Sequence, residues 1–126
     1  NVATTEVAAV VSAAPGVKAA SIYGVAVPGH GGKAGMAALE VDESFNLAAF
    51  RGHVAVRLPA YARPIFLRIM ASLAITETFK QKKHLLAQDG FNPFASRDQL
   101  HVDLGQGYVP LDAATYTRIS SGLMRL

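Results

Sequence analysis

A cluster of lysines interrupts an otherwise apolar part of the chain, in the stretch ITETFKQKK at residues 75–83. Lys80 is the member best suited to chemistry, because it follows two threonines and stands where a loop is expected to pass into a helix. A lysine ammonium is a compact positive charge that can stabilise a reacting carboxylate or phosphate. Three lysines within four residues are also common on a solvated helix start, so the other segments must decide between the two interpretations.

A second candidate is the glycine-rich turn PGHGGK at residues 28–33. A phosphate-binding Walker loop needs a glycine five residues before Gly32 and a Ser or Thr after Lys33, whereas the chain has Val27 and Ala34 there. The looser dinucleotide pattern should open a helix, but the residues that follow are typical of a strand. The turn is therefore interpreted as a flexible hairpin connection.

Other site chemistries find little support. The chain has no cysteine, and its four histidines, His30, His53, His84 and His101, are far apart in the sequence, so no metal site is expected. No Gly-x-Ser-x-Gly elbow supports a serine nucleophile. The expected strands lack the aromatic-rich motif of RNA-binding sheets, so no nucleic acid partner is expected.

The composition is that of one folded domain over residues 1–126, with 51% hydrophobic and 17% charged residues. No apolar run reaches the length of about 18 residues that a membrane span requires. Residues 51–83 hold seven basic side chains against Glu77 alone, a net charge of +6 within a total of +3. This basic third would suit an anionic ligand, unless its arginines are dispersed at the edge of the core.

Hydrophobic periodicity predicts the elements that position these residues. Helices are expected over residues 4–14, from a cap at Ser44 or Asn46 to just before Pro59, over residues 81–88, and over residues 111–121. Strands are expected over residues 17–27, 34–41 and 65–73. Residues 91–110 are expected to be irregular, with at most a short strand near residues 100–104. The predicted fold is α+β, a small three-stranded sheet with flanking helices and a C-terminal tail that carries a short helix.

Five segments recur together in one known family: NVATTEV at residues 1–7, IYGVAVPG at 22–29, KAGMA at 33–37, LPAYARPIFLR at 58–68 and TETFK at 76–80. In this order and spacing they resemble the C-terminal lobe of fatty-acid and very-long-chain acyl-CoA synthetases of the fatty-acid-transport-protein type, within the adenylate-forming superfamily. The resemblance extends to the tail, with GFNP at residues 90–93 and YVPLD at 108–112. It covers nearly the whole chain.

The resemblance implies a ligase that joins a fatty acid to CoA in two steps, through an acyl-adenylate made from ATP with release of pyrophosphate. The chain would be its C-terminal lobe, which rotates between the steps. The N-terminal lobe and the hinge would lie upstream of Asn1. That lobe would be the partner that holds fatty acid, ATP and the accompanying Mg²⁺, so the isolated chain is expected to be inactive. The parent would be cytoplasmic, either free or peripheral at a membrane.

The resemblance also assigns roles to particular residues. Lys80 matches the lysine that contacts carboxylate and phosphate oxygens during adenylation. A face that meets CoA and the other lobe in the second step is matched by five residues: Tyr23, Gly24, Val25, Gly32 and Lys33.

The chain departs from the subgroup at Glu77, where glycine is usual, and this places a carboxylate near the proposed ammonium. Two alternatives remain open: a free-standing module that binds anions, nucleotides or a protein partner through residues 51–83, and a catalytically inactive structural lobe.

Overall fold

The computed structural model describes residues 4–29, 32–73 and 79–123. Their helices are α1 (Thr4–Ser12), α2 (Leu47–Arg57), α3 (Phe79–Asp89) and α4 (Ala113–Ser120), with a short 3₁₀ helix at Ala60–Ala62. The strands are β1 (Val17–Ala26), β2 (Lys33–Val41), β3 (Phe66–Met70), β4 (Gln99–Asp103) and β5 (Tyr108–Pro110). The α+β class predicted from the sequence is confirmed.

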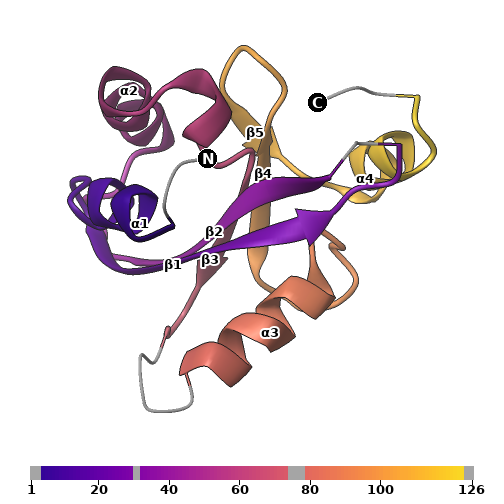
Figure 1. Cartoon of the computed structure of the whole chain (residues 1–126), viewed down its shortest axis with the longest axis horizontal. Coiled ribbons are helices and arrows are strands. Elements are labelled where there is room, and N and C mark those ends of the chain that lie inside the picture. Colours follow the sequence, from indigo (N-terminus) through magenta and orange to yellow (C-terminus); the bar gives the residue numbers. More distant parts are fainter. Residues whose placement is uncertain (1–3, 30–31, 74–78, 124–126) are drawn as a thin grey trace.

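All five strands form one sheet in the order β1-β2-β3-β4-β5 (Figure 1). β2 and β3 are parallel, as expected where α2 connects them, and the other neighbours are antiparallel. The prediction of a three-stranded sheet was wrong, because the tail adds β4, where a short strand near residues 100–104 had been allowed, and β5. β4 pairs with β3 from Phe66↔Val102 to Ile69↔Gln99, and β5 then pairs with β4.

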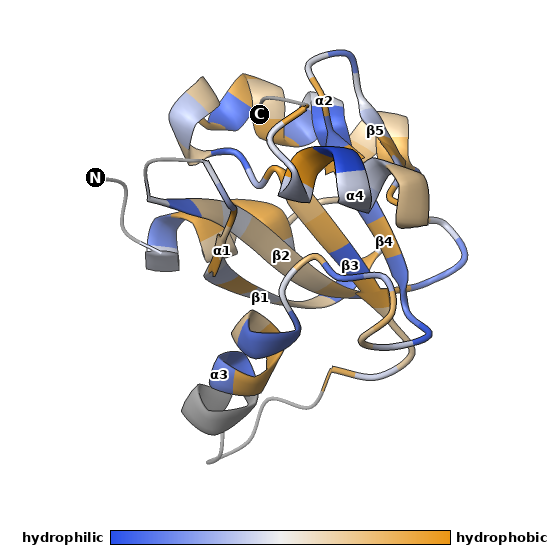
Figure 2. Ribbon diagram, turned by 90° about the vertical axis from the view of Figure 1, so that its right-hand side faces the viewer, coloured by the Kyte–Doolittle hydropathy of each residue, from blue (hydrophilic) through white to orange (hydrophobic). Residues whose placement is uncertain are grey.

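The sheet is buried on both faces, as β2 shows most clearly. Ala37 and Leu39 point to one face and Met36 and Ala38 to the other, and each is fully buried. One face packs against α1 and α2 through Val7, Val11, Phe50 and Val54. The other packs against α3 and α4 through Leu86 and Ile119. Figure 2 shows hydrophobic residues concentrated on the strands between these helices.

Local signals explain where the helices begin and end. Asn46, one of the two expected caps, accepts a hydrogen bond from the Ala49 amide at 2.9 Å and begins α2. Gly90 ends α3 with a φ of 57°, a left-handed conformation that favours glycine. The structured start of α3 at Phe79 is two residues earlier than predicted and includes the backbone of Lys80.

Candidate functional site

The β1–β2 hairpin has a glycine pair facing α1. Gly24 of β1 lies directly opposite Gly35 of β2 in the antiparallel register. A Cβ atom on Gly24 would stand 3.1 Å from both Cβ and Cδ of Lys33, so the stem of Lys33 lies close over this glycine. Gly24 and Gly35 carry no side chain, and both are partly exposed.

A hollow of about 300 Å³ lies over the glycine pair. Its walls come from the start of α1, the hairpin, and the connection that precedes β3. The lining includes Thr4, Val7, Gly24, Lys33, Gly35 and Tyr61. Tyr61 is 78% exposed and Lys33 is exposed, so an aromatic ring and a cation stand beside accessible backbone. Such a set can bind an anionic or planar group, but it offers no acid–base pair for catalysis.

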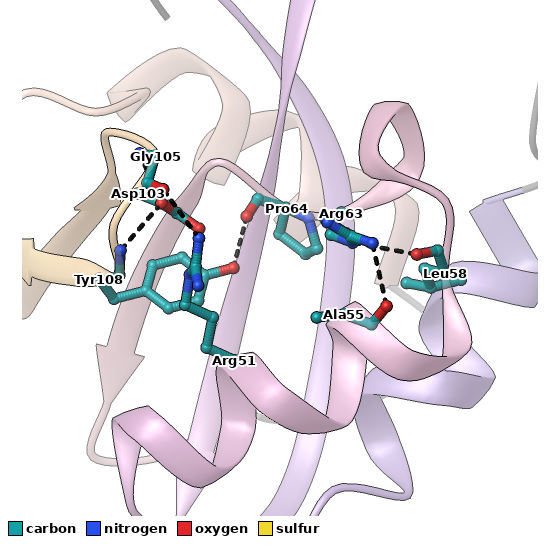
Figure 3. A network of polar contacts seen from close by, with 9 residues as sticks. Arg51, Ala55, Leu58, Arg63, Pro64, Asp103, Gly105 and Tyr108 are labelled. Carbon is teal, nitrogen blue, oxygen red and sulfur yellow. Dashed lines mark hydrogen bonds and ion pairs between the residues drawn. The ribbon is translucent and has the colours of Figure 1, made fainter.

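The wall formed by residues 60–64 is fixed by hydrogen bonds from two sides (Figure 3). Arg63 donates from Nε to the Leu58 carbonyl at 3.0 Å and from Nη2 to the Ala55 carbonyl at 2.9 Å. These carbonyls belong to the last turn of α2 and its cap, so a cation meets the negative end of the helix. On the other side the Tyr108 hydroxyl donates to the Pro64 carbonyl.

A salt bridge extends this network to the turn between β4 and β5. Arg51 of α2 donates from Nε to Asp103 at 2.9 Å, and Figure 3 shows it beside Tyr108. Burial of Asp103 acts to raise its pKa, but hydrogen bonds from Arg51 and the Gly105 amide hold that pKa below its usual value. Burial raises the pKa of Tyr108, so this hydroxyl remains a donor at neutral pH.

The structure brings together some of the five residues proposed for the CoA-facing surface and separates others. Gly24 and Lys33 line the hollow, and Gly32 is exposed beside it in the hairpin turn. The side chain of Val25 is buried on the opposite face, as is that of Tyr23, which reaches the hollow only as part of the strand. Val25 is not among the residues that line the hollow.

The sequence did not single out Thr4 or Tyr61 as site residues. They belong to segments 57 residues apart in the sequence, and only the packing of α1 beside the connection before β3 brings them to one hollow. The available signal was an exposed aromatic residue in a connection, which is a weak indication of binding.

Lys80 lies in the first turn of α3, and its side chain is outside the described residues, as are residues 74–78 with Glu77. α3 packs on the sheet face opposite the hollow. The sheet therefore separates α3, which carries Lys80, from the hollow beside α1, as the positions of α1 and α3 in Figure 1 illustrate.

The four arginines of the basic third donate hydrogen bonds within the fold. Arg51, Arg63 and Arg68 each bond to a carboxylate or to backbone carbonyls of the same chain. Among the described residues, no group of three or more His, Asp or Glu side chains could hold a metal ion. Within the same part of the chain, every helix is too short or too polar to cross a membrane.

Comparison with known proteins gives a match along the whole chain. It is 49% identical over 131 residues to mouse long-chain fatty acid transport protein 3, 46% over 129 residues to the human long-chain fatty acid transport protein 1, and 42% over 130 residues to the rat long-chain fatty acid transport protein 2. Each alignment includes 100% of this chain but only 20%, 20% and 21% of the relative, respectively. The chain therefore spans about a fifth of the length of these relatives. No family model matches it.

A solved structure shares the fold. The crystal structure of ATP-bound MatB from Rhodopseudomonas palustris superimposes with a TM-score of 0.56 at 18% sequence identity. The likeness covers 69% of this chain and 18% of that protein. At this identity the comparison supports the arrangement of helices and strands alone.

Proposed function

We propose that this chain is the C-terminal lobe of a fatty-acid-CoA ligase. It belongs to the long-chain fatty acid transport protein family and spans about one fifth of the length of the members that it matches. The observation that carries the proposal is the match over 100% of the chain at 42 to 49% identity. The fold shared with an ATP-bound protein is consistent with it.

In the proposed reaction the fatty-acid carboxylate attacks the α-phosphorus of ATP, giving acyl-adenylate and pyrophosphate. Lys80 would stabilise the negative charge that gathers on the carboxylate and phosphate oxygens as they meet. The sulfur of CoA then attacks the acyl carbon and AMP leaves. ATP, Mg²⁺ and the fatty acid would be held mainly by the rest of the parent protein, so the isolated chain would make no acyl-CoA.

The hollow on the other face would serve the second step. Its exposed cation, Lys33, suits a phosphate of CoA, and the accessible strands at Gly24 and Gly35 let an extended ligand or the other lobe approach closely. Because the sheet separates this hollow from α3, the lobe would have to turn between adenylation and thioester formation.

The test is fatty-acid-dependent ATP/pyrophosphate exchange by the parent protein, together with thioester formation from supplied acyl-adenylate. Lys80→Ala should lower exchange by about a hundredfold to a thousandfold while largely sparing the thioester step, because the lost charge acts in the first transition state. Lys82→Ala removes an equal charge two residues away and is the matched control. Unchanged exchange in Lys80→Ala would refute the adenylation role and favour an inactive lobe.

The free-standing anion-binding module makes a different prediction. A surface that attracts anions by charge alone should lose similar affinity when either Lys80 or Lys82 is removed. All four arginines that suggested such a surface donate hydrogen bonds within the fold, and this weakens that alternative.

A further inference from the structure

A buried arginine ties α3 to the sheet. Arg68 projects from β3 on the face covered by α3, with its side chain only 7% exposed. It donates from Nη1 to Asp89 at 2.9 Å and from Nε to Asp98 at 2.8 Å. Asp89 is the last residue of α3, whereas Asp98 lies in the loop before β4. One guanidinium therefore joins β3 to the end of α3, 21 residues further along the sequence, and to the loop before β4, 30 residues further along.

Several contacts hold the C-terminal end of α3. Leu86 is buried in the core and Ala87 packs against it, while Leu85 is 59% exposed. Immediately after the helix, Phe91 stacks on Phe66 of β3 with ring centroids 4.7 Å apart. These contacts hold the C-terminal end of α3 against the sheet.

This arrangement makes the angle of α3 important for the residue at its other end. Lys80 and Asp89 are nine residues apart, which corresponds to about 13 Å along an α-helix. A tilt of about 5° at Asp89 would therefore move the Cα atom of Lys80 by about 1 Å. A misplacement of about 1 Å of a catalytic group can lower a rate by a factor of about 100.

The choice of arginine fits control of geometry better than it fits simple stabilisation. Burying a charge is costly, and apolar replacements of buried ion pairs are often at least as stable. A planar guanidinium can direct separate N–H groups at two carboxylates, which the ammonium of lysine cannot do in the same geometry. The guanidinium thus holds the end of α3 through Asp89 and the loop before β4 through Asp98.

We infer that Arg68 is a positioning residue for adenylation, which sets the angle of α3 through Asp89 and thereby places Lys80. This inference rests on the proposed function, since it gives Arg68 a role only through that lysine. Asp98 accepts an equally short bond from the same guanidinium but belongs to a segment that does not carry Lys80. It therefore supplies a control for loss of an ion pair at this arginine.

The experiment compares Asp89→Asn, Asp98→Asn and Arg68→Lys in the full parent protein, each with Lys80 present and with Lys80→Ala. ATP/pyrophosphate exchange, thioester formation and thermal unfolding are each measured for every variant. Asp89→Asn and Arg68→Lys should lower kcat for exchange by about tenfold to a hundredfold, with KM for ATP changed less than about twofold. Asp98→Asn should lower kcat by less than about threefold, and thioester formation should be retained in all three. In the Lys80→Ala background the loss from Asp89→Asn should shrink to less than about twofold.

A purely structural ion pair gives a different pattern. Equal losses from Asp89→Asn and Asp98→Asn, a parallel fall in both half-reactions, or an undiminished Asp89→Asn effect without Lys80 would each overturn the inference. If Arg68→Lys does not fold, the two aspartate variants still make the comparison, because each retains the arginine. Normal exchange in Lys80→Ala alone would refute the proposed function instead, so the two failures are distinguishable.

Discussion

Two tyrosines on opposite faces of the sheet offer the same chemical deletion in contrasting surroundings. The Tyr108 hydroxyl donates to the Pro64 carbonyl and supports the wall of the hollow. The Tyr23 hydroxyl is buried and has no hydrogen-bond partner among the described residues. Burial raises the pKa of both phenols, so both are neutral at pH 7. Replacement by phenylalanine removes one oxygen at each position and keeps the ring.

The expected changes in the free energy of unfolding differ in size and direction. Tyr108→Phe leaves the Pro64 carbonyl without its donor, which should cost about 1 to 2 kcal/mol, while the ring can still pack on Phe50 at 5.8 Å. Tyr23→Phe removes a buried hydroxyl that has no partner in the described part of the chain, so stability should stay the same or rise by about 1 kcal/mol. The two variants should thus differ by about 2 kcal/mol.

Urea unfolding followed by far-ultraviolet circular dichroism at pH 7 measures this difference directly. Equal dependence on urea in the three proteins would show that the variants expose similar surface on unfolding, so the midpoints could be compared. Equal destabilisation by the two substitutions would refute the assignment of Tyr108 as a partnered hydroxyl and Tyr23 as an unpartnered one. A larger loss from Tyr23→Phe would refute it as well.

Two further predictions concern the hollow and a buried histidine. Gly24→Ala would place a Cβ atom 3.1 Å from the Lys33 stem, so it should raise KM for CoA in the parent's thioester step by about tenfold and leave exchange unchanged. Gly52→Ala is the control, because its new Cβ atom would have nothing within 4 Å. Equal KM values in the two variants would contradict the expectation. Burial lowers the pKa of His101 from 6.5, so protonation favours unfolding: the chain should keep its full stability above about pH 6.5 and lose up to about 1.4 kcal/mol by pH 5.5. Urea unfolding of His101→Leu should lack this loss, and an unchanged pH dependence would contradict the assignment.

The strongest local signals in the sequence predicted the first half of the fold. β1 and β2 are long and rich in strand-forming residues, and α2 begins at a capping residue and ends before proline. In the tail the sequence allowed only a short strand near residues 100–104, where β4 lies, and β5 with its three residues was not predicted. They become strands because β3 offers β4 a free edge to pair with, a tertiary effect that local propensity does not contain.

The same limit applies to the candidate site. The resemblance proposed Gly24 and Lys33 together, and the structure places both at one hollow, while their role there stays a prediction. The bonds from Arg68 to Asp89 and Asp98 join residues 21 and 30 positions apart, and no local pattern predicts such pairs. In the sequence Arg68 was one of several cations in a basic third; the fold shows that its charge is directed inward at two carboxylates.

The sheet itself decides how the two proposed steps can be related. The sheet between α3 and the hollow is packed on both faces, as the fully buried side chains of β2 show: Met36, Ala37, Ala38 and Leu39. Such close packing makes the sheet rigid. A rigid sheet cannot direct Lys80 and Lys33 at one reaction centre at the same time. If both lysines serve the same ligase, the whole lobe must turn between the steps. Substitutions on opposite faces should therefore impair different half-reactions, and the separate measurement of exchange and thioester formation is what makes each assignment testable.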